Sequence, residues 1–498
     1  MDALSALLIP VTDLKLLGLI AAGTCAGIYV GAIPGLSVTM AVSILISFTF
    51  SWDVYPALAL MIGIYMGGVY GGSRTAILLN IPGAPAAIAT ALDGYPMAQQ
   101  GKAGEAIGIV TVVSFLGGFV GIFALAAFAP AISDFAIRFQ PRDYFLLGVL
   151  GILLVGSLSG ESLVKGIFSG ALGIAVGAVG MDPLTFTERF TFGFDGMRGG
   201  VSFVAVMIGM FGISEGLMQL HTINAAAVKQ KIGRIIPSWS AVRPHLPLGA
   251  QTSAIGTVIG ALPGTGGDIA ALMAYDHAKR VTRNPEVPFG KGAIQGLVAP
   301  ETANNAAVGG AFIPMLTLGI PGDAVTAIMI GALFIHGLNP GPLLMTNQPD
   351  MFWFIVGSLM LANFFMLVFG LTGIRVFVKI VELPRAVLLP VILLLSIVGA
   401  YAVNNSLTDV YWMLGFGVFG YFLRLYGYPL APVILGVILS RLLDDNWRRA
   451  IISDLEDPAR LMAGIFASPL SAILFASVIL IFVSKTPLWG LVFRRRKA

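Results

Sequence analysis

The chain carries polar residues and a helix-breaking dipeptide inside a stretch that is otherwise apolar enough to cross a bilayer. Residues 71–83 read GGSRTAILLNIPG, and residues 309–322, far downstream, read GGAFIPMLTLGIPG. Proline removes a backbone donor and glycine relaxes the backbone, so each Pro-Gly pair exposes peptide groups. In lipid, such groups persist only where they are buried in protein or line a wet cavity. Two such segments in corresponding halves of a chain are typical of a binding site between discontinuous helices.

The composition indicates a chain that lies mostly in lipid. Of its 498 residues, 57% are hydrophobic and 11% are charged, whereas soluble domains carry about 25% charged residues. The formal net charge of +4 is typical of Lys and Arg in cytoplasmic loops. No basic stripe interleaved with aromatic residues indicates nucleic-acid binding. Cys25 is the single cysteine, which excludes an intrachain disulfide framework and a multi-cysteine metal site.

Apolar runs along the chain predict an all-α polytopic membrane protein. A helix needs about 20 residues to cross the hydrocarbon core. Several runs are shorter than this and end in Pro-Gly, so we expect discontinuous, re-entrant helices. The long runs at 103–129 and 351–381 are expected to form a scaffold. The run at 462–484 is expected to form a C-terminal transmembrane helix.

Short motifs recur in the same order in the two halves of the chain. GAIPG at residues 31–35 matches GALPG at 260–264, and IPG at 81–83 matches IPG at 320–322. A duplicated unit with small insertions gives this pattern, so two membrane repeats are predicted.

Basic residues suggest how the two repeats lie in the membrane. They gather in the stretch between the repeats and in the last residues of the chain, and both positions favour the cytoplasm. With a cytoplasmic linker and repeats of inverted topology, the first repeat begins outside, the second ends outside, and the last helix returns the tail to the cytoplasm. The predicted segments are a first membrane repeat at 1–228, a basic cytoplasmic linker at 229–246 and a second membrane repeat at 247–445. Residues 446–498 are predicted to hold a linker, the last transmembrane helix and a basic cytoplasmic tail.

The four Pro-Gly pairs and their polar neighbours are the predicted substrate site. Half-helix N-termini present amides that suit a carboxylate. Arg74 could hold a carboxylate in a two-pronged hydrogen bond, or it could lie at a helix end and reach the headgroups. The candidates for substrate binding are Pro34, Gly35, Ser37, Ser73, Arg74, Asn80, Pro82, Gly83, Pro263, Gly264, Thr265, Gly266, Pro321 and Gly322.

A second set of polar residues near the breaks could bind a cation. Unwound carbonyls suit sodium, and intramembrane ionisable groups usually mark an ion or substrate path. The candidates are Asp268, Glu301, Asn304, Asn305 and Thr317. The two acidic residues could instead pair with Lys279, Lys291 or Arg74, and the two asparagines could instead form interhelical hydrogen bonds. No metal other than a sodium ion is expected, because no two histidines have metal-ligand spacing.

The discontinuous helices predict a secondary transporter, and two other function classes compete with that interpretation. Gly266-Gly267-Asp268 with Tyr275-Asp276 is similar to the motifs of intramembrane aspartyl hydrolases. That class, however, requires Gly-x-Gly-Asp, and position 265, where the first glycine would stand, is Thr. The two aspartates of that class also come from separate helices. A passive anion channel is the third reading, and it differs from a transporter because it cannot accumulate its solute.

Several stretches together resemble the large membrane subunit of the tripartite tricarboxylate transporter family. They extend from about residue 15 to residue 440 and lie at residues 31–35, 70–83, 92–98, 299–306 and 318–322. The resemblance implies a non-enzymatic subunit in the bacterial inner membrane that works with a small four-helix membrane subunit and a periplasmic solute-binding protein. It implies import of tricarboxylates or related carboxylates, driven by an ion gradient and without a cofactor other than a coupling ion. By similarity, the Pro-Gly breaks and residues 301–305 form the carboxylate and sodium sites.

Overall fold

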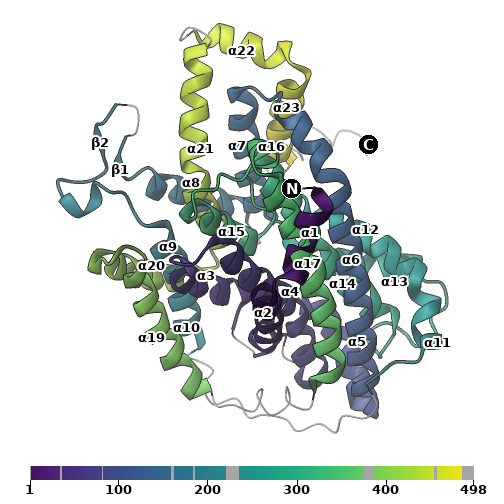
Figure 1. Cartoon of the computed structure of the whole chain (residues 1–498). Helices are drawn as coiled ribbons and strands as arrows, with labels where there is room; N and C mark the ends of the chain where they lie inside the picture. The colour runs from purple at the N-terminus through teal and green to yellow at the C-terminus, as the bar shows by residue number, and fades with distance from the viewer. Residues whose placement is uncertain are drawn as a thin grey trace.

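The computed structural model describes residues 2–33, 36–80, 82–158, 162–182, 185–219, 235–374, 385–453 and 457–484, and these fold almost entirely into helices (Figure 1). The strands within these ranges form a two-stranded antiparallel hairpin, in which β1 (Gly180–Met181) pairs with β2 (Glu188–Arg189). By length and composition, four described helices could each cross a membrane: Leu14–Ala32, Val54–Leu79, Ala87–Ala136 and Pro349–Thr372. The prediction of an all-α polytopic membrane protein is therefore confirmed.

The first half of the chain contributes the helices α1 (Ala3–Thr12), α2 (Leu14–Ala32), α3 (Val38–Thr49), α4 (Val54–Leu79), α5 (Ala87–Met97), η1 (Ala98–Lys102), α6 (Ala103–Ala136), α7 (Pro141–Leu158), α8 (Leu163–Gly177), η2 (Asp195–Met197), α9 (Phe203–Met207), η3 (Ile208–Ile213) and α10 (Ser214–Gln219). The second half contributes α11 (Trp239–Val242), η5 (Arg243–His245), α12 (Leu246–Gly260), α13 (Gly266–Val281), α14 (Gln295–Leu318), α15 (Ala324–Ile335), α16 (Pro342–Asn347), α17 (Pro349–Thr372), α19 (Arg385–Asn404), α20 (Leu407–Leu425), α21 (Ala431–Ser453), α22 (Pro458–Ala467) and α23 (Pro469–Ser484).

Glycines allow the first and second long helices of each half to pack backbone to backbone. On α4, a Cβ atom added to Gly67 would lie 2.1 Å from the carbonyl oxygen of Thr24 in α2. On α12, a Cβ atom added to Gly256 would lie 2.2 Å from the carbonyl oxygen of Ala303 in α14. Small residues at such contacts are the usual means by which membrane helices associate. The same packing in both halves supports the predicted duplication.

Helices α4 and α14 lie at the centre of the molecule. Nearly every residue from Ala57 to Leu78, and from Gly296 to Thr317, is buried. A helix that is buried on all sides must be covered by other helices rather than by lipid. The two helices also touch each other, since the ring centroids of Tyr65 and Phe312 lie 6.0 Å apart.

The structure shows where the polar residues that precede the breaks lie. Residues 71–75 and 301–305 are inside the regular helices α4 and α14. The backbone leaves these helices only at Asn80 and Gly319, which adopt the left-handed conformation with φ of 55° and 71°. These residues occupy matching positions in the two halves, and Asn and Gly are the residues that best tolerate this conformation at a helix end.

The predicted scaffold and tail helices differ in how they end. Helix α6 covers the run at 103–129 and extends it to Ala136, as expected for a scaffold helix. Helix α17 ends at Thr372, and residues 375–381 of the run at 351–381 lie outside the described residues. The run at 462–484 is broken near Ser468, where two helices meet at an angle of 104°. Proline at position 469 and an extended Ser468 backbone explain this break.

Parts of the predicted segment boundaries lie outside the described residues. Residues 229–234 of the predicted linker and residues 485–498 of the predicted tail belong to these parts. The remainder of the linker forms the short helices α11 and η5, and α12 begins at Leu246. The repeat boundaries and the inverted topology stay predictions.

Candidate functional site

Each half of the chain folds its second Pro-Gly segment back onto the end of its own first long helix. A Cβ atom added to Gly83 would lie 2.1 Å from the carbonyl oxygen of Gly31, at the end of α2. A Cβ atom added to Gly322 would lie 2.6 Å from the carbonyl oxygen of Gly260, at the end of α12. Gly31 and Gly260 hold the same place in the matching GAIPG and GALPG motifs. Glycine is required at both corners because no side chain fits between the two backbones.

The breaks of the two halves also meet each other. The backbone N–H of Ala86, which precedes α5, donates a hydrogen bond of 3.0 Å to Oδ1 of Asp268 in the first turn of α13. The hydroxyl of Tyr65 in α4 donates to Oδ2 of Asp323, which caps the N-terminus of α15. A Cβ atom added to Gly266 would lie 3.1 Å from the Cβ atom of Asp323. The N-terminal ends of α5, α13 and α15 are therefore neighbours, whereas Pro34 and Gly35 lie outside the described residues.

A pocket opens beside these converging ends. It is lined by Gly264, Pro321, Asp323 and Ala324 from the breaks, and by Phe211 and Ala431 among others. Two of the predicted Pro-Gly pairs thus contribute to one pocket. Irregular backbone that lines a cavity is the setting in which unwound membrane segments bind solutes.

The carboxylate of Glu301 is buried and surrounded by hydroxyl groups. Its carboxylate accepts hydrogen bonds from the hydroxyls of Ser73 in α4, Thr90 in α5 at 2.5 Å and Ser114 in α6 at 2.9 Å. The residue is 1% exposed. Within the described ranges, no Lys, Arg or His forms an ion pair with it, so the alternative pairing with Lys279, Lys291 or Arg74 is not formed. A buried carboxylate is costly unless its charge is neutralised.

Arg74 lies deep in the protein, so the alternative in which it reaches the headgroups is not observed. Its side chain is 1% exposed. Its Nη2 donates to the carbonyl oxygen of Gly370 at 2.6 Å, and its Nε donates to the Tyr70 hydroxyl at 3.1 Å. Gly370 lies in the last turn of α17, where a cation interacts favourably with the helix dipole. Arg74 therefore joins α4 to the end of α17, and its contact with a carboxylate substrate stays a prediction.

Substituting Arg74 by alanine is expected to lower the thermal unfolding midpoint of the purified chain as well as its uptake activity. The substitution removes at least two hydrogen bonds from a charged donor, each worth about 1.5–3 kcal/mol. Thermal unfolding in detergent, followed by tryptophan fluorescence, would measure the loss. Arg243→Ala, at an outer position before α12, is the control. An unchanged thermal unfolding midpoint together with complete loss of uptake would contradict the role of Arg74 in joining α4 to α17. That result would favour direct contact between Arg74 and the substrate.

Several of the predicted site residues satisfy the hydrogen bonds of helix ends. The Ser37 hydroxyl caps α3 by accepting from the Met40 N–H at 3.1 Å. The Thr265 hydroxyl donates to the carbonyl oxygen of Leu262 at 3.0 Å, after the end of α12. The Thr317 hydroxyl donates within its own helix, to Ile313. Capping and solute binding are compatible at an N-terminus, but these contacts show that each residue already has a structural role.

The two asparagines of α14 differ in their contacts. Nδ2 of Asn304 donates to the carbonyl oxygen of Val69 in α4 at 3.4 Å, which is the interhelical bond that the alternative predicted. Nδ2 of Asn305 donates to the carbonyl oxygen of Glu301 at 3.0 Å. Oδ1 of Asn305 is buried and has no hydrogen-bond partner among the described residues. Oδ1 of Asn305 is thus an uncharged oxygen, one turn from Glu301, that is available as a ligand for a cation.

Four residues that complete these contacts were not among the predicted site residues. Asp323 follows Pro321-Gly322 directly, and this position was a signal that could have identified it. Tyr65, Thr90 and Ser114 are single polar residues in apolar runs, and no local pattern shows which neighbour they face. Asp93 is another buried acidic residue, but it accepts hydrogen bonds from the N–H groups of residues 290, 292 and 293 and so anchors a loop.

The aspartates of the hydrolase motif do not face each other. Asp268 and Asp276 lie on the same helix, α13. Asp276 is exposed and pairs with Arg280 one turn further along. In the part of the chain that the structure describes, no group of three or more His, Cys, Asp or Glu side chains could hold a metal ion.

Comparison with known proteins places the chain in a family. The model of the tripartite tricarboxylate transporter TctA family matches residues 17–435. The chain belongs to this family. Its members are the large subunits of tripartite tricarboxylate transporters and work with the other components of those transporters. The resemblance seen in the sequence motifs is therefore confirmed.

Two relatives come from Agrobacterium vitis. One is an uncharacterised 52.8 kDa protein in the TAR-I ttuC′ 3′ region, 36% identical over 461 residues, which are 92% of this chain and 91% of the relative. The other is an uncharacterised protein in the TAR-II ttuC′ 3′ region, 38% identical over 225 residues, which are 45% of this chain and 93% of the relative. No solved structure matches this chain.

Proposed function

We propose that this chain is the transmembrane subunit through which tricarboxylates or related carboxylates enter a bacterial cell across its inner membrane. A periplasmic solute-binding protein delivers the substrate, a small four-helix membrane subunit completes the transporter, and a sodium or proton gradient drives the uptake. The observation that carries this proposal is the pocket lined by both Pro-Gly breaks of the second half, beside the hydrogen bond between Ala86 of the first half and Asp268 of the second, in a chain of this family. Discontinuous helices that meet at the interface of two repeats are the usual setting of a secondary transporter's site.

The charges where the N-terminal ends of α5, α13 and α15 lie together indicate how a carboxylate would bind. The Ala86 amide at the start of α5 is bonded to Asp268, and the first-turn amide of Thr326 in α15 is bonded to Asp323 at 2.7 Å. These amides would otherwise be available to an anion. In the described conformation, two internal carboxylates therefore occupy positions that suit a substrate carboxylate. A substrate anion and these aspartates repel each other, so substrate binding requires either displacement of the aspartates or a cation bound with the substrate.

Glu301 is the proposed point of coupling. Its carboxylate is buried, bonded by hydroxyl groups alone and one turn from the unpartnered Oδ1 of Asn305. Sodium prefers oxygen ligands of this kind, and a proton would neutralise the same charge. The residue sits on α14, four residues before Asn305 and three residues before Asn304, which contacts α4. Occupancy of Glu301 by a cation can therefore alter the contact between the central helices of the two halves.

Uptake into proteoliposomes tests the proposed function. The chain would be reconstituted with the two other subunits, and radiolabelled citrate, succinate or tartrate would be added outside. An imposed sodium or pH gradient is expected to raise the internal concentration above the external one, and collapse of the gradient by an ionophore is expected to release it. Equilibration without accumulation would favour a passive channel instead, and no entry of any carboxylate would contradict the proposal.

A further inference from the structure

The β1–β2 hairpin and the loop that follows it expose four phenylalanine rings. Phe186, Phe190, Phe192 and Phe194 are between 58% and 80% exposed. Phe186, Phe190 and Phe192 also have φ values of 50–54°, a left-handed conformation that bulky residues rarely adopt. Backbone strain of this kind costs about 1–3 kcal/mol per residue and persists only where the surroundings enforce it. We call residues 180–182 and 185–194 the aromatic hairpin. Figure 1 shows it projecting from the helical body.

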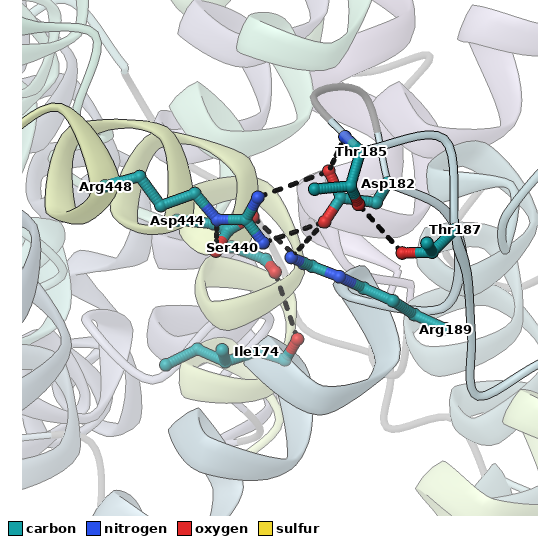
Figure 2. Close-up of polar contacts among 8 residues, drawn as sticks. All are labelled: Ile174, Asp182, Thr185, Thr187, Arg189, Ser440, Asp444 and Arg448. Atoms are coloured by element: carbon teal, nitrogen blue, oxygen red, sulfur yellow. Dashed lines mark hydrogen bonds and ion pairs between the residues drawn. The ribbon is translucent and has the colours of Figure 1, made fainter. Parts of the chain in front are cut away.

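An ion-pair network fixes the aromatic hairpin to α21 (Figure 2). Asp182, which is 2% exposed, pairs with Arg189 of the hairpin and with Arg448 of α21, the latter at 2.8 Å. Asp444 of α21 pairs with the same two arginines, at 3.0 and 3.1 Å. Two acids and two bases thus form a closed, neutral group. This network holds the hairpin against α21.

The other charges of this region are also neutralised internally. Glu188 pairs with Arg198 at 2.7 Å, and Asp195 pairs with Arg198 at 2.9 Å. The Thr191 hydroxyl and the Arg198 guanidinium together lower the pKa of the Glu188 carboxyl, so Glu188 stays ionised and paired. Each of the five charged residues between positions 180 and 200 therefore has an ion-pair partner. The aromatic rings are the groups that this surface offers to its surroundings.

The aromatic hairpin follows α8 and lies close to α20, and both helices expose large apolar side chains. Helix α8 leads into it and exposes Val164 and Phe168, and α20 exposes Leu407 and Tyr411. The Lys165 ammonium near the start of α8 donates to the carbonyl oxygen of Tyr426 just past the end of α20, at 2.6 Å.

The opposite ends of the same two helices meet at the hairpin loop. A Cβ atom added to Gly196, two residues past the last of the four phenylalanines, would lie 3.7 Å from a methyl carbon of Thr408, near the start of α20. The hairpin loop therefore lies at the start of α20, the end of that helix at which Leu407 and Tyr411 are exposed.

We propose that the four phenylalanine rings of the aromatic hairpin insert into the interfacial region of the lipid bilayer and anchor this edge of the protein. Phenylalanine on an apolar face that continues a lipid-exposed surface is suited to the boundary between headgroups and acyl chains. A protein partner would be expected to meet free polar or charged groups around such an aromatic centre, and the hairpin's charges are already paired. The anchor places the Asp182 network at the level of the membrane surface.

Depth-dependent fluorescence quenching tests this anchor. The full chain would carry Phe192→Cys or Phe186→Cys in a Cys25→Ser background, labelled with an environment-sensitive NBD dye, in nanodiscs of zwitterionic lipid without the other subunits. A label at Arg283→Cys, in the exposed loop after α13, is the matched control. The hairpin labels are expected to show a blue-shifted emission and to lose most of their fluorescence to lipids with a nitroxide near the carbonyl group. The control label is expected to respond to aqueous iodide instead.

Two results would overturn the proposal. The first is quenching of both hairpin labels by iodide and not by the nitroxide lipids. The second is protection from iodide that appears only after addition of the solute-binding protein or the small membrane subunit, which would assign the rings to a protein interface. Two separate labelling positions keep the test valid if one variant fails to fold. The measurement needs no transport activity, so it is independent of the proposed function.

Discussion

Substituting Glu301 by glutamine is expected to abolish gradient-driven carboxylate uptake while the protein still folds. Glutamine keeps the size of the side chain and can still bond to the hydroxyls of Ser73, Thr90 and Ser114. It cannot carry the charge that a proton or a sodium ion would neutralise. Loss of a charged ligand costs about 3 kcal/mol, which corresponds to about a 100-fold loss of cation affinity.

The measurement is the initial rate of uptake under an imposed sodium or pH gradient, with the thermal unfolding midpoint as a test of folding. Glu286→Gln removes an equal charge from an exposed loop position and is the matched control. The control is expected to transport at the wild-type rate. Gradient-driven uptake by Glu301→Gln at that same rate would remove Glu301 from the coupling mechanism.

Substituting Gly322 by leucine is expected to be the most damaging single change at the breaks. A Cβ atom at this position would lie 2.4 Å from the Cα atom of Ala311 and 2.6 Å from the carbonyl oxygen of Gly260. No rotamer can relieve a clash with backbone, so Pro321 and Asp323 must move away from the pocket. Overpacking of this kind costs about 1–3 kcal/mol or more. Gly83→Leu is expected to have the same effect, because Gly83 is enclosed in the same way.

Gly415→Leu is the matched control, since a Cβ atom at Gly415 would meet nothing within 4 Å. Ile479→Ala in α23, which is far from the breaks in the sequence, is a second control. Carboxylate uptake and expression level would be measured for all four variants. Equal loss of uptake in the control or in the α23 variant would show that the breaks have no special role, and the site assignment would then be wrong.

Local rules made several features of this protein predictable from its sequence. The deficit of charged residues required a membrane protein, because so little of the surface could face water. Pro82-Gly83 and Pro321-Gly322 marked the ends of helices correctly, since a proline cannot continue the backbone hydrogen bonds of a helix. The motif order predicted a duplication, and the contacts of Gly83 and Gly322 agree with that prediction. Each of these inferences uses composition or short motifs that can be read directly along the chain.

The exact extent of the helices was less predictable. Ser73 and Arg74 were predicted only to lie near the Pro82-Gly83 break, and α4 continues through them to Leu79. Polar side chains do not break a helix by themselves when neighbouring helices supply their hydrogen-bond partners. Here Glu301 and the carbonyl oxygen of Gly370 supply those partners.

By itself, the sequence determined that this is an all-helical membrane protein whose helices break at Pro82-Gly83 and Pro321-Gly322, and it predicted a duplication. Only the tertiary structure decided that Glu301 meets three hydroxyls from α4, α5 and α6, and that Ala86 meets Asp268. It likewise decided that Tyr65 meets Asp323. The reason is that these partners lie more than 180 residues apart. Which side chains meet depends on how each helix is rotated about its axis and packed against the others, and no local pattern records that rotation.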